Sequence, residues 1–178
     1  MPGDVHDPVS RASYSFTRNG DDLYVETWME PGGGLPPHWH PRQEEVWFCI
    51  DGRVEFRLGK DKRVIGPEDG EMLVRRDTVH GVKAVEDRTV HLGCRVSPAL
   101  DLEAFLTESA AAANQGLFMK GGIPKGLKGT RWAADFLDRY GDETVMVFPP
   151  QFVQKATKAL FAGKGKRGPS ATMESDAH

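Results

Sequence analysis

The feature that most constrains the fold is a fixed spacing of two glycines, two histidines and one glutamate. Gly32 is followed by five residues, then by His38 and His40 with one residue between them, then by four residues, Glu45, six residues and Gly52. In a β-strand, residues two positions apart point to the same face of the sheet. We therefore expect both imidazoles to point toward one position from a single strand.

The residues that follow predict short strands separated by turns. Residues 45–50 are mostly apolar and typical of a strand, and the dipeptide Asp51-Gly52 is preferred in tight hairpin turns. Residues 54–58 alternate between apolar and polar side chains, as a half-buried strand does. After a further turn, His80 lies in a later strand pattern at residues 77–82. The order of these segments predicts a mainly β domain.

These residues also carry chemistry. Imidazole nitrogen and carboxylate oxygen are ligands that Zn, Mn, Fe, Ni and Cu share. Three histidines and one glutamate leave one or two coordination positions open on such a metal. Open positions distinguish catalytic metal sites from structural ones.

Two segments resemble the motifs of a known family. Residues 32–52 resemble the first motif of the cupin superfamily, and residues 70–82 resemble its second motif. The second motif has Arg75 where proline is usual, Asp77 where glycine is usual, and a spacing one residue shorter than the common form. The resemblance covers about residues 20–97. It implies a double-stranded β-helix, or jelly-roll, barrel.

The resemblance further implies one divalent transition metal inside the barrel, with Fe, Mn, Ni, Cu and Zn all open as its identity. The implied metal ligands are His38, His40, Glu45 and His80. Glu44 is the nearest rival to Glu45, but its spacing to Gly52 is one residue too long, and it would point to the opposite face of the strand. Chance clustering in a polar loop is the plainer alternative, and it predicts neither the glycines in register nor the later histidine.

Strand alternation also predicts which side chains surround the metal. Trp47 and Cys49 share a face with Glu45 and should line the cavity, together with Phe56 and Met72. Such a pocket suits a small aromatic or otherwise apolar molecule that carries a metal-binding oxygen. In the strand at 89–96, His91 lies opposite the apolar face and is expected to be exposed or at an interface. His6 and His178 lie in the termini and have no expected role.

Composition narrows the class of protein. The 178 residues fit one domain, the mean hydropathy is −0.48, and no apolar run approaches the roughly 20 residues of a membrane span. A net charge of −3 gives no electrostatic case for nucleic acid. The first residues show no secretory signal, so a cytoplasmic location is expected. Cys49 and Cys94 are expected to be free thiols, although the sequence leaves a disulfide open.

The period of the apolar residues changes after Pro98 from about two to about 3.6, which predicts helices after the barrel. The expected organisation is a flexible N-terminus at 1–12, the barrel at 13–97, a helical extension packed on the barrel at 98–163, and a disordered tail at 164–178. Within the extension we expect about three helices, from Asp101 to Gly116, from Thr130 to Gly141, and from Pro149-Pro150 to Gly163.

This extension resembles the C-terminal extension of short, uncharacterised bacterial cupin-domain proteins, on the residues 122–124, Phe136 and Pro149-Pro150. Its second helix carries the aromatic stripe Trp132, Phe136 and Tyr140. The stripe must be buried against an end of the barrel, its outer sheet or a second subunit, and a homodimer is the default expectation.

The leading functional hypothesis is a metal-dependent enzyme that acts on a small, aromatic or polyketide-like molecule. A dioxygenase is the first candidate, and a metal-dependent isomerase or cyclase is close behind it. A non-catalytic cupin that binds a small ligand is the alternative from another class, since the fold hosts unrelated functions. No helix-turn-helix pattern precedes the barrel, which argues against a transcription regulator.

Overall fold

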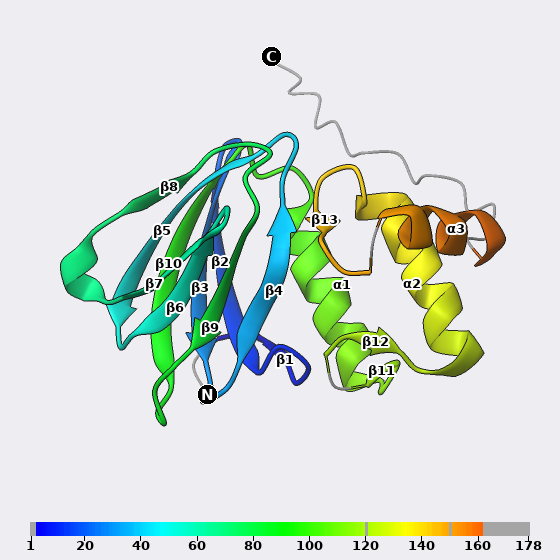
Figure 1. The fold of residues 1–178 in the computed structure, drawn as a ribbon, viewed down its shortest axis with the longest axis horizontal. Coiled ribbons are helices and arrows are strands. Elements are labelled where there is room, and N and C mark those ends of the chain that lie inside the picture. Colours follow the sequence, from blue (N-terminus) through cyan, green and yellow to red (C-terminus); the bar gives the residue numbers. More distant parts are fainter. Residues whose placement is uncertain (1–2, 120, 150, 162–178) are drawn as a thin grey trace, which may run out of the picture.

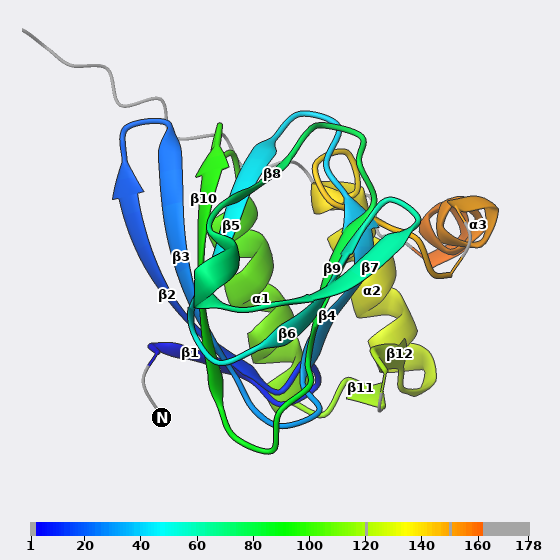
Figure 2. The ribbon, with the colours of Figure 1, turned by 60° about the vertical axis from the view of Figure 1, so that its left-hand side comes forward.

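The computed structural model describes residues 3–119, 121–149 and 151–161, and the predicted tail at 164–178, with His178, lies outside them. Two sheets face each other and enclose the core (Figures 1 and 2). The six-stranded sheet has the order β1 (Val5–Asp7), β2 (Ala12–Asn19), β3 (Asp22–Met29), β10 (Val90–Ser97), β5 (Glu44–Asp51) and β8 (Met72–Val74). The five-stranded sheet has the order β13 (Val145–Met146), β4 (Gly34–Trp39), β9 (His80–Ala84), β6 (Val54–Leu58) and β7 (Asp61–Ile65). The mainly β, jelly-roll prediction is confirmed.

Burial along β5 follows the alternation that the sequence predicts. Glu45, Trp47 and Cys49 are buried between the sheets, whereas the side chain of Ile50 on the other face is 39% exposed. The strand β10 behaves in the same way, because its apolar residues at alternate positions are buried. The pattern of period two therefore orients the side chains that form the site.

The prediction of a hairpin turn at Asp51-Gly52 is wrong. The strands on its two sides, β5 and β6, belong to different sheets, so the dipeptide is where the chain crosses from one sheet to the other. Gly52 is needed there because its φ is 85° and because a Cβ atom would lie 2.6 Å from Cγ1 of Val90. A glycine turn signal identifies the bend but not the partner of each strand.

The N-terminal segment is more ordered than its sequence suggests. Val5–Asp7 forms β1, which pairs antiparallel with β2, and Asp7 is buried. The amide of Asn114 donates a hydrogen bond to the backbone oxygen of His6 at 2.7 Å. These contacts place part of the expected flexible terminus in the six-stranded sheet. The segment lacked a periodic pattern because the strand has only three residues.

The helices after the barrel are α1 (Leu102–Asn114), α2 (Gly126–Tyr140) and α3 (Gln151–Phe161), and a small hairpin of β11 (Phe118–Met119) and β12 (Ile123–Pro124) separates the first two. The prediction that Thr130 caps the start of α2 is wrong, because the N-cap is Lys125, five residues earlier. Thr130 lies inside the helix, and its hydroxyl donates to the backbone oxygen of Gly126 at 2.9 Å. The predicted end at Gly141 is confirmed. A threonine can bond back to the preceding turn of a helix as well as cap its start.

The helix α1 connects the barrel to the rest of the extension (Figure 1). Leu102 belongs to the buried core, and Phe105 packs against it. The ring centroid of Phe105 lies 4.9 Å from that of Phe136 and 5.8 Å from that of Tyr140. Phe136 and Tyr140 of the aromatic stripe are therefore buried against α1, whereas Trp132 is partly exposed and packs on Phe118. Among the described residues, no helix is long and apolar enough to cross a membrane.

Candidate metal centre

The three histidines come from neighbouring strands of one sheet. His38 in β4 lies directly opposite His80 in β9, and His40 follows the end of β4. The register of the two strands shifts between Leu35 and His38, where Pro36 has no N–H to donate to the ladder. The candidate ligand atoms of the three imidazoles lie within 4.8 Å of one another. This arrangement confirms that the two-residue spacing brings His38 and His40 to one position.

Glu45 reaches the same position from the opposite sheet. Its Oε1 lies 3.2 Å from Nε2 of His40, and its Oε2 lies 2.8 Å from Nε2 of His80. The indole N–H of Trp47 donates a hydrogen bond to Oε2 at 2.7 Å. His40, His80 and Glu45 are all buried, and His38 is partly exposed. The structure thus brings together all four predicted ligands, with His38 on the more open side.

The Nδ1 atom of each histidine is bonded to a backbone carbonyl oxygen. The acceptors for His38, His40 and His80 are the backbone oxygens of Pro36 at 2.8 Å, Glu143 at 2.9 Å and Thr78 at 3.0 Å. A carbonyl oxygen only accepts hydrogen bonds, so each Nδ1 must carry the proton. The same tautomer in all three rings leaves the Nε2 lone pairs free for a metal.

The Nε2 atoms themselves lack suitable partners. The Nε2 atoms of His40 and His80 are buried and make no hydrogen bond of acceptable geometry with any described residue, even though the Glu45 carboxylate is close. Buried nitrogens without a hydrogen-bond partner are costly in a native structure. A cation between the Nε2 atoms and the carboxylate would satisfy all of them. The residues present therefore fit a divalent metal.

The electrostatics of the site favour an ionised carboxylate. Burial opposes ionisation of Glu45, but the close imidazoles of His40 and His80 outweigh it and hold the pKa of Glu45 well below its usual value. Burial likewise lowers the pKa of His40, but Glu45 more than compensates and the pKa is raised. Burial and the two other imidazoles lower the pKa of His38 well below its usual value. These shifts favour the ionised form of Glu45 and the protonated form of His40.

The other carboxylate, Glu44, takes no part in this cluster. It is only partly buried and lies opposite Ser97 in the pairing of β5 with β10. Because adjacent residues of a strand point to opposite faces, its side chain is directed away from Glu45. The register that the sequence predicts for this strand is therefore the one observed.

The predicted pocket residues lie in and beside the core. Trp47, Cys49, Phe56 and Met72 are all buried. A hollow of about 290 Å³ is lined by Phe56, Leu58, Asp61 and Arg63. Leu58 lies directly opposite His80 in the pairing of β6 with β9, so this hollow adjoins the histidine cluster.

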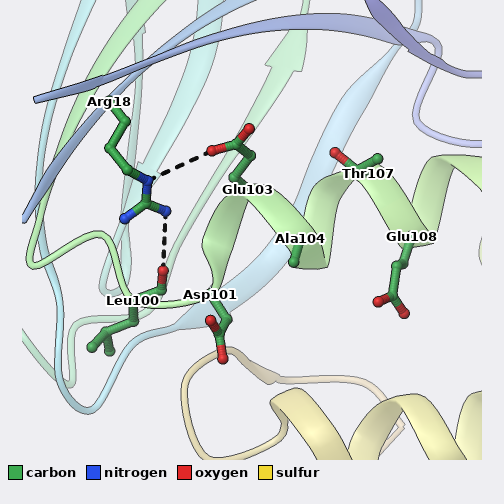
Figure 3. A pocket seen from close by; sticks show the side chains of 7 residues that line it. All are labelled: Arg18, Leu100, Asp101, Glu103, Ala104, Thr107 and Glu108. Carbon is green, nitrogen blue, oxygen red and sulfur yellow. Dashed lines mark hydrogen bonds and ion pairs between the residues drawn. The ribbon is translucent and has the colours of Figure 1, made fainter. Parts of the chain in front are cut away.

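A second hollow, of about 420 Å³, lies against the start of α1 and away from the predicted site residues (Figure 3). The guanidinium of Arg18 borders it, 3.7 Å from the carboxylate of Glu103, and donates a hydrogen bond to the backbone oxygen of Leu100. Of the charged residues that face this hollow, Arg18, Glu103 and Glu108 already have partners within the protein. It carries no chemistry comparable to that of the histidines.

The two other histidines among the described residues, His6 and His91, and both cysteines lie outside the centre. His91 is on the outer face of the six-stranded sheet, as expected, where its ring stacks on Trp28 with centroids 4.5 Å apart and its Nε2 lies 3.0 Å from Glu26. Nδ1 of His6 lies 3.1 Å from the hydroxyl of Ser13. The thiols of Cys49 and Cys94 are free and buried.

Two residues that contact the centre were not predicted from the sequence. Glu143 provides the carbonyl that fixes His40, and the Thr144 hydroxyl lies 3.4 Å from the same Nδ1. These residues are more than 100 positions from His40 in the chain. No local pattern could have found them, because a backbone carbonyl leaves no trace in residue type.

The barrel region of the chain is similar to known proteins. Residues 25–96 match the model of the cupin domain family, and no curated protein matches the chain. KdgF from Halomonas sp. superimposes with a TM-score of 0.49 and 21% identity, over 56% of this chain and 90% of its own. An RmlC-like cupin from Shewanella frigidimarina has a TM-score of 0.49 and 18% identity, over 57% of this chain and 89% of its own. Recombinant oxalate oxidase in complex with glycolate has a TM-score of 0.47 and 17% identity, over 55% of this chain and 56% of its own. Residues 25–96 of this chain therefore form a domain of the cupin superfamily.

Proposed function

We propose that this protein is a metal-dependent enzyme acting on a small molecule, with a dioxygenase as the first candidate reaction. The observation that carries the proposal is the shared tautomer of His38, His40 and His80, whose Nδ1 atoms all donate to backbone carbonyls. That arrangement has little structural purpose unless the Nε2 atoms serve a common ligand. With Glu45 as a fourth ligand, the set suits Fe, Mn, Ni, Cu or Zn.

A bound metal would polarise an oxygen of the substrate or provide the place where dioxygen and substrate react. The protein residues have separate tasks. Glu45 supplies a negative charge that offsets the metal charge, and the indole N–H of Trp47 holds that carboxylate in place. Burial of His40, His80 and Glu45 limits the access of water to these three side chains. His38, the most exposed ligand, marks the side from which a substrate would approach.

The hollow beside His80 supports a small substrate with both apolar and charged parts. Phe56 and Leu58 supply an apolar wall, and Asp61 and Arg63 supply charges at the edge strand β7. A molecule that binds the metal through one oxygen would extend along this wall. The proposal also includes a cytoplasmic location and a homodimer. The dimer is supported by β7 and β8, which end their sheets without another strand among the described residues.

The test is to measure metal content in the purified protein and dioxygen consumption with aromatic diols, before and after loading with Fe, Mn, Ni or Cu. The His40→Ala variant is the control, because it lacks one proposed metal ligand while the rest of the chain is unchanged. Metal-dependent dioxygen consumption that His40→Ala abolishes is the expected result. Binding of zinc alone without dioxygen consumption would favour isomerase or cyclase chemistry. Failure to bind any of these metals would contradict the proposal.

A further inference from the structure

A segment from beyond the barrel contacts two of the histidines. The short strand β13 pairs antiparallel with β4, so that Met146 lies opposite His38. The backbone N–H of Val147 donates to the backbone oxygen of Pro37 at 3.0 Å and extends this pairing by one residue. We call residues 143–147 the strap. Figure 1 shows it running from the end of α2 along the outer edge of β4.

The strap is anchored at both ends. At its start, Oε2 of Glu143 accepts a hydrogen bond from the backbone N–H of Asp101 at 3.1 Å, and its Oε1 lies 3.8 Å from Arg42. Toward its end, the backbone oxygen of Met146 accepts from the side-chain amide of Gln154 in α3 at 2.8 Å. These contacts hold the carbonyl of Glu143 against His40.

His40 differs from the other two histidines in the source of its acceptor. The carbonyls that hold His38 and His80 belong to residues two positions earlier in the chain, and they come with the barrel itself. The carbonyl for His40 comes from the strap, outside the cupin domain at residues 25–96. Without the strap, the buried Nδ1 of His40 would lose the backbone carbonyl that fixes its tautomer, although the side chain of Gln43 in the barrel also lies beside this ring.

We propose that the strap positions His40 and that its docking on β4 is thermodynamically coupled to metal binding. This inference rests on the proposed metal centre. If docking orders a ligand and so strengthens metal binding, then metal must strengthen docking by the same factor. Loss of an outer partner of a metal-binding histidine weakens metal binding by about 10- to 100-fold. The C-terminal extension is then part of the functional centre as well as a cover for the barrel.

The decisive readout is amide hydrogen exchange of the full-length protein, with and without saturating zinc. The Val147 amide reports strap docking because it donates across to β4. We expect zinc to slow its exchange by about tenfold or more. The control is the Lys125 amide, which donates within the extension to the oxygen of Leu117 and should change much less. Unchanged exchange at Val147 in protein that has bound zinc would overturn the coupling.

Two full-length variants provide a second test. Val147→Pro removes the N–H that bonds to Pro37, and Val147→Ala keeps it while removing a side chain that is 44% exposed. Zinc affinity, measured by competition with a chromophoric chelator, should fall about tenfold or more in V147P relative to V147A. A larger loss in V147A than in V147P would contradict the role of the backbone contact. If the unmodified protein binds no metal, the proposed function fails. If the protein binds zinc but zinc leaves the exchange of the Val147 amide unchanged, only the proposed coupling of the strap to metal binding fails.

Discussion

Replacement of Glu45 by glutamine tests the centre at its most buried charge. The carboxylate has three close partners: Nε1 of Trp47 at 2.7 Å, Nε2 of His80 at 2.8 Å and Nε2 of His40 at 3.2 Å. A hydrogen bond to a charged group contributes about 1.5–3 kcal/mol, against about 0.5–1.5 kcal/mol for a neutral one. Glutamine retains an oxygen for Trp47 but loses the charge. We expect the metal-free variant to lose about 1–3 kcal/mol of unfolding free energy at pH 7.

For a chain of this size, each kcal/mol lowers the Tm by about 2–4 °C, so thermal unfolding followed by circular dichroism should detect the change. Glu44→Gln is the matched control, because the neighbouring carboxylate is on the other face and its replacement should cost less than about 0.5 kcal/mol. Zinc affinity should fall in E45Q and stay the same in E44Q. A larger effect of E44Q in both assays would refute the register that places Glu45 inside.

Three further predictions follow from the same geometry. His38→Ala and His40→Ala should each lose most of the bound metal, as elemental analysis after dialysis would show, and full occupancy in both would remove them from the ligand set. Because the pKa of His40 is raised, a metal must displace its proton at and below pH 6.5. The apparent metal affinity should therefore fall with decreasing pH, and calorimetry in two buffers should detect the released protons. A metal affinity that does not change with pH would contradict this prediction. Truncation after Val96 removes α1, including buried Leu102, and should give insoluble or loosely folded protein; a stable, metal-loaded fragment would show that the barrel needs no helices.

The parts of the fold that were predictable are those that local spacing determines. Alternation along β5 orients Glu45 and Trp47, and the two-residue spacing brings His38 and His40 to one position, whereas the inclusion of His80 came from the resemblance to the cupin motifs. These features depend only on the period of a strand. The same reasoning identified the end of α2, since Gly141 is a local stop signal.

The parts that could not be predicted depend on contacts between distant segments. The crossing at Asp51-Gly52 requires knowledge of which sheet each strand joins, and β1 has too few residues to show a pattern. The strap is the clearest case, because its contribution to His40 is a backbone oxygen. A carbonyl is present at every residue, so only the three-dimensional fold distinguishes the one at Glu143.

The most direct test of the central claim is the long-range proton–nitrogen NMR spectrum of the histidine rings in protein saturated with zinc. The spectrum separates Nδ1 from Nε2 and shows which nitrogen carries a proton and which binds the metal. We predict that His38, His40 and His80 each bind zinc through Nε2 and keep a proton on Nδ1, as their carbonyl acceptors require. Zinc bound through Nδ1 in any of the three rings, or fewer than three rings shifted by zinc, would contradict the account.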